Sequence, residues 1–166
     1  IRNSPKPVIA AVEGAAAGAG VSLALACDMV VAADNAKFVM AYSSVGLSPD
    51  GGGAWVLARN LPRATAMHML LSAAPMTATA LHQLGVVSQL AQPGNALGQA
   101  LNSAASINAR APNVMASIKE LMNDACDTNF TTHLQAEKKH FVRNLHHANG
   151  AEGISAFLEK RPPHYK

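Results

Sequence analysis

The stretch Pro7-Val8-Ile9-Ala10-Ala11-Val12-Glu13-Gly14-Ala15-Ala16-Ala17-Gly18-Ala19-Gly20 decides the fold of this 166-residue chain. Its first half, residues 7–12, is a short run of small and β-branched residues, which predicts a fully buried strand of the kind found in parallel sheets. Its second half is a glycine-rich turn at 14–20, and the apolar run after it predicts a helix over 20–27. This order predicts an α/β fold.

The glycine-rich turn can bind an oxygen atom. The first N–H groups of a helix that begins there lack acceptors, and that end of the helix carries a partial positive charge. A phosphate is one candidate ligand, but the chain has neither a P-loop Lys-Ser/Thr nor a complete dinucleotide-binding fingerprint. A carbonyl oxygen that gains negative charge during a reaction is the other candidate.

A second turn, Gly46-Leu47-Ser48-Pro49-Asp50-Gly51-Gly52-Gly53, places a carboxylate on a sharp bend. An ordinary turn aspartate is the simplest interpretation. Taken with the first turn, Asp50 is a candidate base that moves a proton on the carbon skeleton beside the bound carbonyl. Because a carboxylate in water is a weak base, this role predicts apolar neighbours around it, for which Met40, Tyr42 and Trp55 are candidates.

The rest of the chain predicts further α/β layers followed by helices. Thr77 is a predicted N-cap for a helix that ends at Gly85. We therefore divide the chain into an α/β part at 1–95 and a helical part at 96–166. The expected strands are 29–33, 36–40 and 86–88, and the expected helices are 54–59, 63–71, 78–84, 96–108, 113–125, 130–147 and 151–160.

Composition and charge argue against several classes of protein. The chain is 49% hydrophobic and 14% charged, which is typical of a globular domain and not of a disordered chain. Its net charge is +3, and we interpret its clearest basic cluster, Lys138-Lys139-His140, as a solvated helix face. A nucleic-acid partner is not expected, because no basic stripe with interleaved aromatic residues is present.

Two further absences in the sequence bear on location and metals. The chain has no signal-peptide pattern and no apolar run of about 20 residues, which favours a soluble, cytoplasmic protein without a membrane partner. Its seven histidines lack the spacing of metal ligands, so we expect no metal site.

Residues 7–20 resemble the central signature of the crotonase superfamily, the enoyl-CoA hydratases and isomerases, and residues 25–32 continue it. The resemblance covers the C-terminal two-thirds of a typical member. Together with a start at Ile1 in place of Met, this leads us to expect that an N-terminal part is missing. The resemblance implies a partial crotonase-like ββα spiral core over 1–95. It implies a helical oligomerisation and CoA-covering region over 96–166, which forms a homotrimer or a dimer of trimers. Further matching positions are Thr77, Ala80, 85–87 and 152–161.

The resemblance also assigns roles to individual residues. It implies an acyl-CoA thioester as the substrate, with coenzyme A as part of that substrate and no separate cofactor. It places an oxyanion-hole N–H on Ala19 and the acid of several isomerase branches on Asp50. The two glutamates with which hydratases add water fall on Ser22 and Tyr42, which argues against hydratase activity. The expected substrate- and CoA-binding residues are Gly18, Gly20, Tyr42, Gly52, Phe157 and Lys160.

Residues 36–53 look most like the ring-epoxide isomerase branch of bacterial phenylacetate degradation. The expected function is therefore an acyl-CoA isomerase of fatty acid or aromatic acid catabolism, which shifts a double bond or rearranges a ring epoxide. Three alternatives stay open. One is an enoyl-CoA hydratase, another is a hydrolase or dehalogenase that uses Asp50 in a hydrolytic or covalent step, and the third is a non-catalytic acyl-CoA-binding or assembly module.

Overall fold

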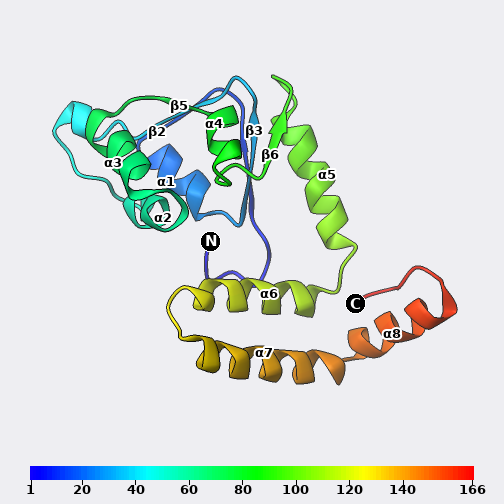
Figure 1. Cartoon of the computed structure of the whole chain (residues 1–166). Helices are drawn as coiled ribbons and strands as arrows, with labels where there is room; N and C mark the ends of the chain where they lie inside the picture. Colours follow the sequence, from blue (N-terminus) through cyan, green and yellow to red (C-terminus); the bar gives the residue numbers. More distant parts are fainter. The chain divides into compact units, whose positions relative to one another are not determined.

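The computed structural model describes all residues of the chain, 1–166, and has a mixed α/β architecture (Figure 1). The chain forms two compact units: unit 1 comprises Ile1 and Val8–Ser103, and unit 2 comprises Arg2–Pro7 and Ala104–Lys166. The boundary between them lies inside a helix that begins at the predicted division at 95/96. The roles assigned to the two parts stay predictions.

The helices and strands of the chain have the following bounds. The strands are β1 (Ile9–Val12), β2 (Ala15–Ala17), β3 (Met29–Ala33), β4 (Lys37–Val39), β5 (Met76–Thr77) and β6 (Gln89–Ala91). The helices are α1 (Ala19–Ala26), the 3₁₀ helix η1 (Ser43–Val45), α2 (Gly53–Asn60), α3 (Arg63–Ser72), α4 (Ala78–Gln83), α5 (Ala96–Asn108), α6 (Pro112–Ala125), α7 (Phe130–Leu145) and α8 (Ala148–Glu159).

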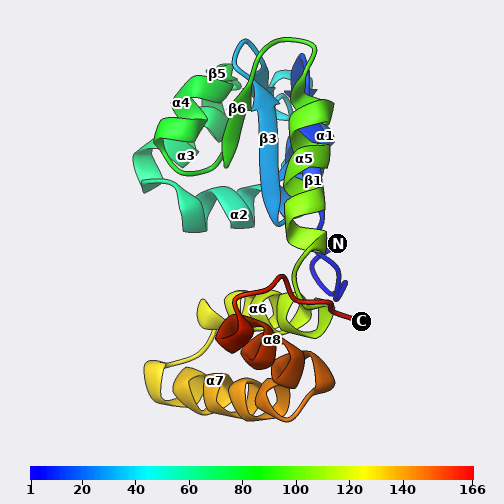
Figure 2. The same ribbon diagram turned by 90° about the vertical axis from the view of Figure 1, so that its right-hand side faces the viewer.

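The first sheet of unit 1 is parallel, with the strand order β1-β3-β6. The central strand β3 is buried, and Val31 on it clusters with Ala96 and Ala100 of α5, which lies along the sheet (Figure 2). The strand predicted at 7–12 forms and pairs in parallel, but the prediction that it is fully buried is wrong. Ala11 is exposed, because β1 is an edge strand of the sheet.

The second sheet of unit 1 has the order β2-β4-β5. Its first strand, β2, lies within the stretch predicted as a turn, so that prediction is wrong for residues 15–17. Ala16 pairs with Phe38 of β4. Three successive alanines carry little strand propensity, so this strand depends on a partner about twenty residues later in the chain. The glycine-rich turn is therefore shorter than predicted, and a single residue, Gly18, connects β2 to α1.

The α4 helix begins as predicted and ends one residue earlier than predicted, at Gln83 with Leu84 as its C-cap, and the strand expected after it begins later. The hydroxyl oxygen of Thr77 accepts a hydrogen bond from the N–H of Ala80 (3.1 Å), which confirms the predicted cap. Gly85 follows the helix with φ of +78°. The N–H groups of Val86 and Val87 then donate back to the carbonyl of Leu81 at 2.8 and 3.2 Å. Because these two residues complete the helix end, β6 begins only at Gln89, although the N–H of Ser88 already donates to the carbonyl of Val30 on β3 (2.8 Å).

Unit 2 consists of helices that enclose a polar interior. The hydroxyl oxygen of Ser117 on α6 accepts hydrogen bonds from Arg143 (3.0 Å) and Asn144 (2.9 Å) of α7. His140 is buried beside Arg143, with 2.9 Å between their side-chain nitrogens. The prediction of a solvated face for residues 138–140 is therefore wrong for His140, while Lys138 and Lys139 are exposed.

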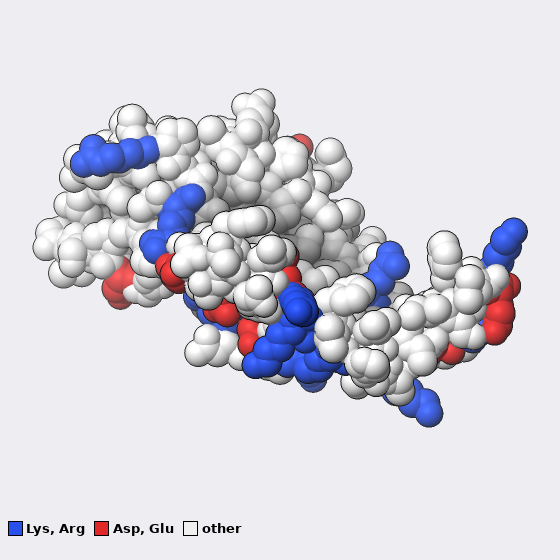
Figure 3. All heavy atoms as spheres, turned by 60° about the horizontal axis from the view of Figure 1, so that its bottom comes forward, with Lys and Arg blue, Asp and Glu red and all other residues white.

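Most of the face drawn in Figure 3 is uncharged; several Lys and Arg side chains gather in its lower middle, next to Asp or Glu, and the others lie apart. None of the helices combines the length and the hydropathy that a membrane span requires.

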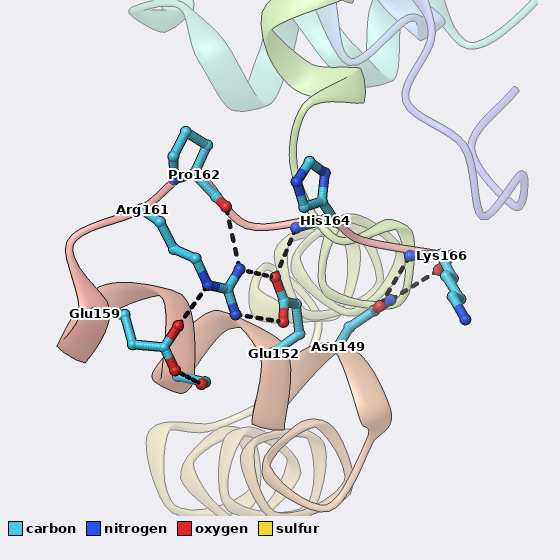
Figure 4. A network of polar contacts seen from close by, with 8 residues as sticks. Asn149, Glu152, Glu159, Arg161, Pro162, His164 and Lys166 are labelled. Atoms are coloured by element: carbon cyan, nitrogen blue, oxygen red, sulfur yellow. Dashed lines mark hydrogen bonds and ion pairs between the residues drawn. The ribbon is translucent and has the colours of Figure 1, made fainter.

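The last residues of the chain fold back onto α8 through two side chains (Figure 4). The carboxylate of Glu152 accepts hydrogen bonds from the guanidinium of Arg161 (2.6 and 3.0 Å) and from the backbone N–H of His164 (2.8 Å). Asn149 bonds both the N–H and the carbonyl of Lys166, at 3.0 and 2.9 Å. The Arg161 hydrogen bonds, followed by the one from His164, lower the pKa of Glu152 from 4.5 to about 2.

This lowered pKa predicts acid-dependent release of the tail. The folded pKa of Glu152 lies below its ordinary value, so the contribution of this carboxylate is fully present above pH 4.5 and is lost as the pH falls through about 2. The amide resonance of His164, followed by NMR against pH, should shift with a midpoint near 2. In a Glu152→Gln variant the same resonance should already be shifted at neutral pH. A midpoint at or above 4.5, or a variant spectrum like that of the wild type, would contradict this account.

Candidate active site

Gly18 turns the chain from β2 into α1. Its N–H donates to the carbonyl of Val39 (2.8 Å), and its own carbonyl accepts from the N–H groups of Val21 (3.0 Å) and Ser22 (3.3 Å). Its φ of +50° and ψ of −120° form a conformation that a residue with a Cβ rarely adopts. Glycine at this position therefore sets where α1 begins.

The first two residues of α1 present their N–H groups to solvent. Ala19 and Gly20 are exposed, and the N–H groups at the start of a helix have no acceptor within it. The space beside Gly20 is open, because a Cβ built there would meet nothing within 4 Å. The arrangement can therefore donate hydrogen bonds to a negatively charged oxygen at the positive end of the helix.

Asp50 lies in the turn before α2, and its backbone is fixed to α1. Its carbonyl oxygen accepts a hydrogen bond from the hydroxyl of Ser22 (2.9 Å) and another from the N–H of Gly53 (3.2 Å). Gly51 and Gly52 make the bend between them, with φ of +59° and +82°. The turn that holds the carboxylate is thus attached to the helix whose N–H groups face solvent.

Tyr42 joins the two turns through its side chain. Its hydroxyl donates a hydrogen bond to Oδ1 of Asp50 at 2.5 Å, and it lies 3.4 Å from the hydroxyl oxygen of Ser22. Its ring lies over Gly18, since a Cβ built on that glycine would be 3.8 Å from the ring atom Cζ. The structure therefore brings together one residue of each turn, Gly18 and Asp50, with Ser22 of α1 and Tyr42.

The apolar surroundings predicted for Asp50 are not found. Its side chain is exposed in this structure. Met40 is fully buried in the core of unit 1, and Trp55 lies on α2 with the guanidinium of Arg59 3.8 Å from its ring centroid. Of the three neighbours predicted, only Tyr42 reaches the carboxylate, and it does so with its hydroxyl. The prediction is wrong because Met40 is packed into the core and Trp55 packs against Arg59 on its own helix, so neither side chain lies against the carboxylate.

Gly53 is a site residue that the sequence did not reveal. A Cβ at this position would collide with the hydroxyl oxygen of Ser22 and would lie 2.9 Å from the methyl carbon of Met40. Helices α1 and α2 therefore approach each other so closely that only glycine fits between them. By contrast, the predicted substrate-binding residue Gly52 is exposed, and a Cβ built on it would meet nothing within 4 Å. Glycine is favoured there because the backbone has a positive φ.

The two predicted CoA contacts lie on unit 2. Phe157 of α8 is 82% exposed, and Lys160 ends that helix with φ of +55°. Both side chains are accessible to a ligand. That they reach the nucleotide of CoA stays a prediction.

Alanine substitutions separate the roles of the glycines. Gly53→Ala should lower the free energy of unfolding by about 1–3 kcal/mol, because the new methyl group overpacks the space held by Ser22. Gly52→Ala should cost about 1–2 kcal/mol through its positive φ alone. The matched control is Gly14→Ala, whose Cβ meets nothing within 4 Å, and it should change stability by less than about 0.5 kcal/mol. Urea unfolding followed by Trp55 fluorescence measures all three, and equal costs for Gly53→Ala and Gly14→Ala would contradict the close approach.

Comparison with known proteins identifies the family. The enoyl-CoA hydratase/isomerase family model matches residues 1–166. The chain is 40% identical over 161 residues to the 1,2-epoxyphenylacetyl-CoA isomerase of Escherichia coli K12, covering 97% of this chain and 62% of the relative. It is 39% identical over 166 residues to a probable enoyl-CoA hydratase of Rhodobacter capsulatus, covering 99% of this chain and 64% of the relative.

The solved structures agree with the sequence relatives. The crystal structure of an enoyl-CoA hydratase from Polaromonas sp. JS666, here called the Polaromonas relative, is 63% identical and superposes with a TM-score of 0.99. That match covers 100% of this chain and 65% of the Polaromonas relative. The chain thus spans less than two-thirds of the length of each of these three relatives. Its α/β fold is the crotonase fold, and the chain belongs to the enoyl-CoA hydratase/isomerase family.

Proposed function

We propose that this protein isomerises an acyl-CoA thioester through an enolate, either by shifting a double bond or by rearranging a ring epoxide. The observation that carries the proposal is the fixed position of Asp50 on a turn attached to the N-terminal end of α1. The family supports an acyl-CoA substrate, and the similarity to the E. coli 1,2-epoxyphenylacetyl-CoA isomerase supports isomerisation.

The chemistry follows from the two turns. The N–H of Ala19 holds the thioester oxygen, where the partial positive charge of α1 stabilises the negative charge of the enolate. The carboxylate of Asp50 removes a proton from the carbon next to the thioester, and the electrons of that C–H bond move toward the oxygen. For a 3-enoyl thioester, return of the proton to carbon 4 completes the shift to the conjugated 2-enoyl product. The carboxylate is thereby regenerated, and the product keeps the same number of protons as the substrate, so the reaction needs no other proton donor or acceptor.

A hydratase is the second candidate, because several similar proteins carry that name. These include the R. capsulatus protein and the E. coli 2,3-dehydroadipyl-CoA hydratase, which is 36% identical to this chain. Addition of water needs a base that activates the water molecule. The hydroxyls of Ser22 and Tyr42 stand where the resemblance places the hydratase glutamates, and both donate their protons to Asp50. This arrangement favours isomerisation.

We further propose that residues 96–166 assemble the protein into a homotrimer or a dimer of trimers and that Phe157 and Lys160 cover the bound CoA. The support is the outward apolar surface of unit 2, which a monomer would leave in water. Its large exposed side chains, with their exposed fractions, include Met122 (69%), Phe130 (80%), Phe141 (68%), Phe157 (82%) and Leu158 (73%).

The isomerase proposal predicts a reaction that depends on Asp50. With a 3-enoyl-CoA as substrate, absorbance of the conjugated 2-enoyl thioester should rise. Asp50→Asn should lower the rate by about 100- to 10,000-fold. The assay uses this chain alone and a fusion that adds the part of the Polaromonas relative that the chain does not cover. Equal rates for the wild type and Asp50→Asn would remove Asp50 from the mechanism. Loss of absorbance from a 2-enoyl-CoA would indicate hydration. Release of free CoA would indicate a hydrolase, and binding without any conversion would indicate a non-catalytic module.

The assembly proposal predicts that a charge on the apolar surface breaks the oligomer. The wild-type chain should sediment as a trimer or hexamer, and Phe141→Glu should sediment as a smaller species. The matched control is Gln135→Glu, which adds the same charge at an exposed polar position of α7. A monomeric wild type, or equal effects of the two substitutions, would contradict the proposal.

A further inference from the structure

Tyr42 is built into the fold more firmly than a residue that only lines a pocket. It precedes η1 with φ of −60° and ψ of −46°, and its carbonyl accepts hydrogen bonds from the N–H groups of Val45 and Leu47, each at 3.0 Å. Its side chain is 8% exposed, and its ring lies against Gly18. Backbone and ring are therefore both fixed before the hydroxyl makes any contact.

The hydroxyl of Tyr42 is committed to Asp50. At 2.5 Å, the distance from this hydroxyl to Oδ1 is that of a charge-assisted hydrogen bond from O–H to a carboxylate. The hydroxyl of Ser22 donates its proton to the backbone carbonyl of Asp50 at 2.9 Å. A hydroxyl has one proton, and both of these protons point to Asp50, so the longer 3.4 Å contact between the Ser22 and Tyr42 hydroxyls is secondary to the two bonds to Asp50.

These contacts distinguish the two carboxylate oxygens of Asp50. Oδ1 is occupied by the Tyr42 hydroxyl, and the backbone of the residue is held by Ser22 and Gly53. An exposed side chain in a glycine-rich turn would otherwise rotate freely. The phenol therefore restricts the carboxylate to one orientation and leaves Oδ2 as the oxygen without a bond to the protein side chains.

We propose that Tyr42 is a positioning residue that holds Oδ1 of Asp50, so that Oδ2 alone takes the proton from the substrate and returns it. This inference rests on the proposed isomerase function. In the step, the C–H bond next to the thioester breaks, an O–H bond forms at Oδ2, and the enolate keeps the electron pair. The O–H bond at Oδ2 then breaks as the new C–H bond forms, and the Tyr42 hydroxyl keeps its own proton throughout. Tyr42 thereby gains a role different from the substrate contact that the sequence predicted.

The first experiment tests the hydrogen bond without any substrate. The chain has two tyrosines, so the hydroxyl protons of Tyr42 and Tyr165 can be assigned in proton NMR spectra by substituting each in turn. A downfield hydroxyl proton should be present in the wild type and in Tyr165→Phe. It should be lost in Tyr42→Phe, and it should move upfield or vanish in Asp50→Ala. Its absence from the wild type, or its persistence in Asp50→Ala, would overturn the role of Tyr42.

The second experiment tests whether the carboxylate returns its own proton. The fusion with the Polaromonas segment is incubated with a 3-enoyl-CoA in D₂O, and the product is analysed for deuterium by mass spectrometry. Tyr42→Phe should lower kcat by about 10- to 100-fold with little change in KM, and it should raise the deuterium content of the product, because a mobile carboxylate exchanges its proton with solvent. Tyr165→Phe should leave both values at the wild-type level.

The outcomes separate this inference from the proposed function. A raised KM with an unchanged kcat would make Tyr42 a substrate contact and overturn its positioning role. An unchanged kcat and deuterium content would overturn that role as well. A wild type that shows the downfield proton but no isomerisation would contradict the proposed function, and with it the proton return by Oδ2, while the contact between Tyr42 and Asp50 would stand.

Discussion

The attachment of the Asp50 turn to the start of α1 is the constraint on which the rest of the site depends. A glycine-rich turn in solvent has many conformations, and ordering it costs conformational entropy. Two hydroxyl groups restrict this one: Ser22 bonds the backbone of Asp50, and Tyr42 bonds its carboxylate. Since Ser22 lies on the first turns of α1, the carboxylate and the exposed N–H groups of that helix are held as one rigid arrangement. Enolate chemistry needs such a fixed distance between acid and oxyanion site.

Close helix packing makes this attachment possible. Ser22 is 2% exposed and reaches the Asp50 turn only because α2 begins with a glycine, Gly53, where any larger residue would collide with the serine hydroxyl. The core residue Met40, which directly follows β4, lies close to the same point. The glycines of this site therefore have separate physical roles. Gly51 and Gly52 adopt positive φ, whereas Gly53 leaves room for the side chain of Ser22. A single substitution at any of them acts on the geometry of the carboxylate.

The sequence predicted most of the fold because its signals are local. Strand β3 and the eight α-helices follow from apolar patterns and caps such as Thr77, and the family follows from residues 7–20. The sequence did not predict β2 at 15–17, the start of β6 at Gln89, or the burial of His140. β2 forms because it pairs with β4, which lies about twenty residues later in the chain. β6 starts later than predicted because Val86 and Val87 still bond to α4. His140 is buried beside Arg143 on α7, which contacts its ring nitrogen.

The candidate site was predicted residue by residue but not as an arrangement. Glycine content and the family signature indicated Ala19 and Asp50, whereas the contacts of Ser22 and Tyr42 with Asp50 join residues 28 and 8 positions apart in the chain. No periodicity connects such positions. The apolar burial expected for Asp50 was wrong for the same reason, because Trp55 follows its own helix and packs with Arg59.

The measurement that tests the central claim most directly is deuterium exchange on a saturated acyl-CoA, which cannot isomerise. Over many cycles of proton removal and return in D₂O, in a fraction of which the acid on Asp50 exchanges with solvent, the fusion with the Polaromonas segment should introduce deuterium at the carbon next to the thioester. Asp50→Asn should reduce this exchange to the rate without protein. That result would show that the turn held by Ser22 and Tyr42 delivers a base to the enolate position. The absence of exchange with the wild type, or the same exchange with the Asn variant, would contradict the account.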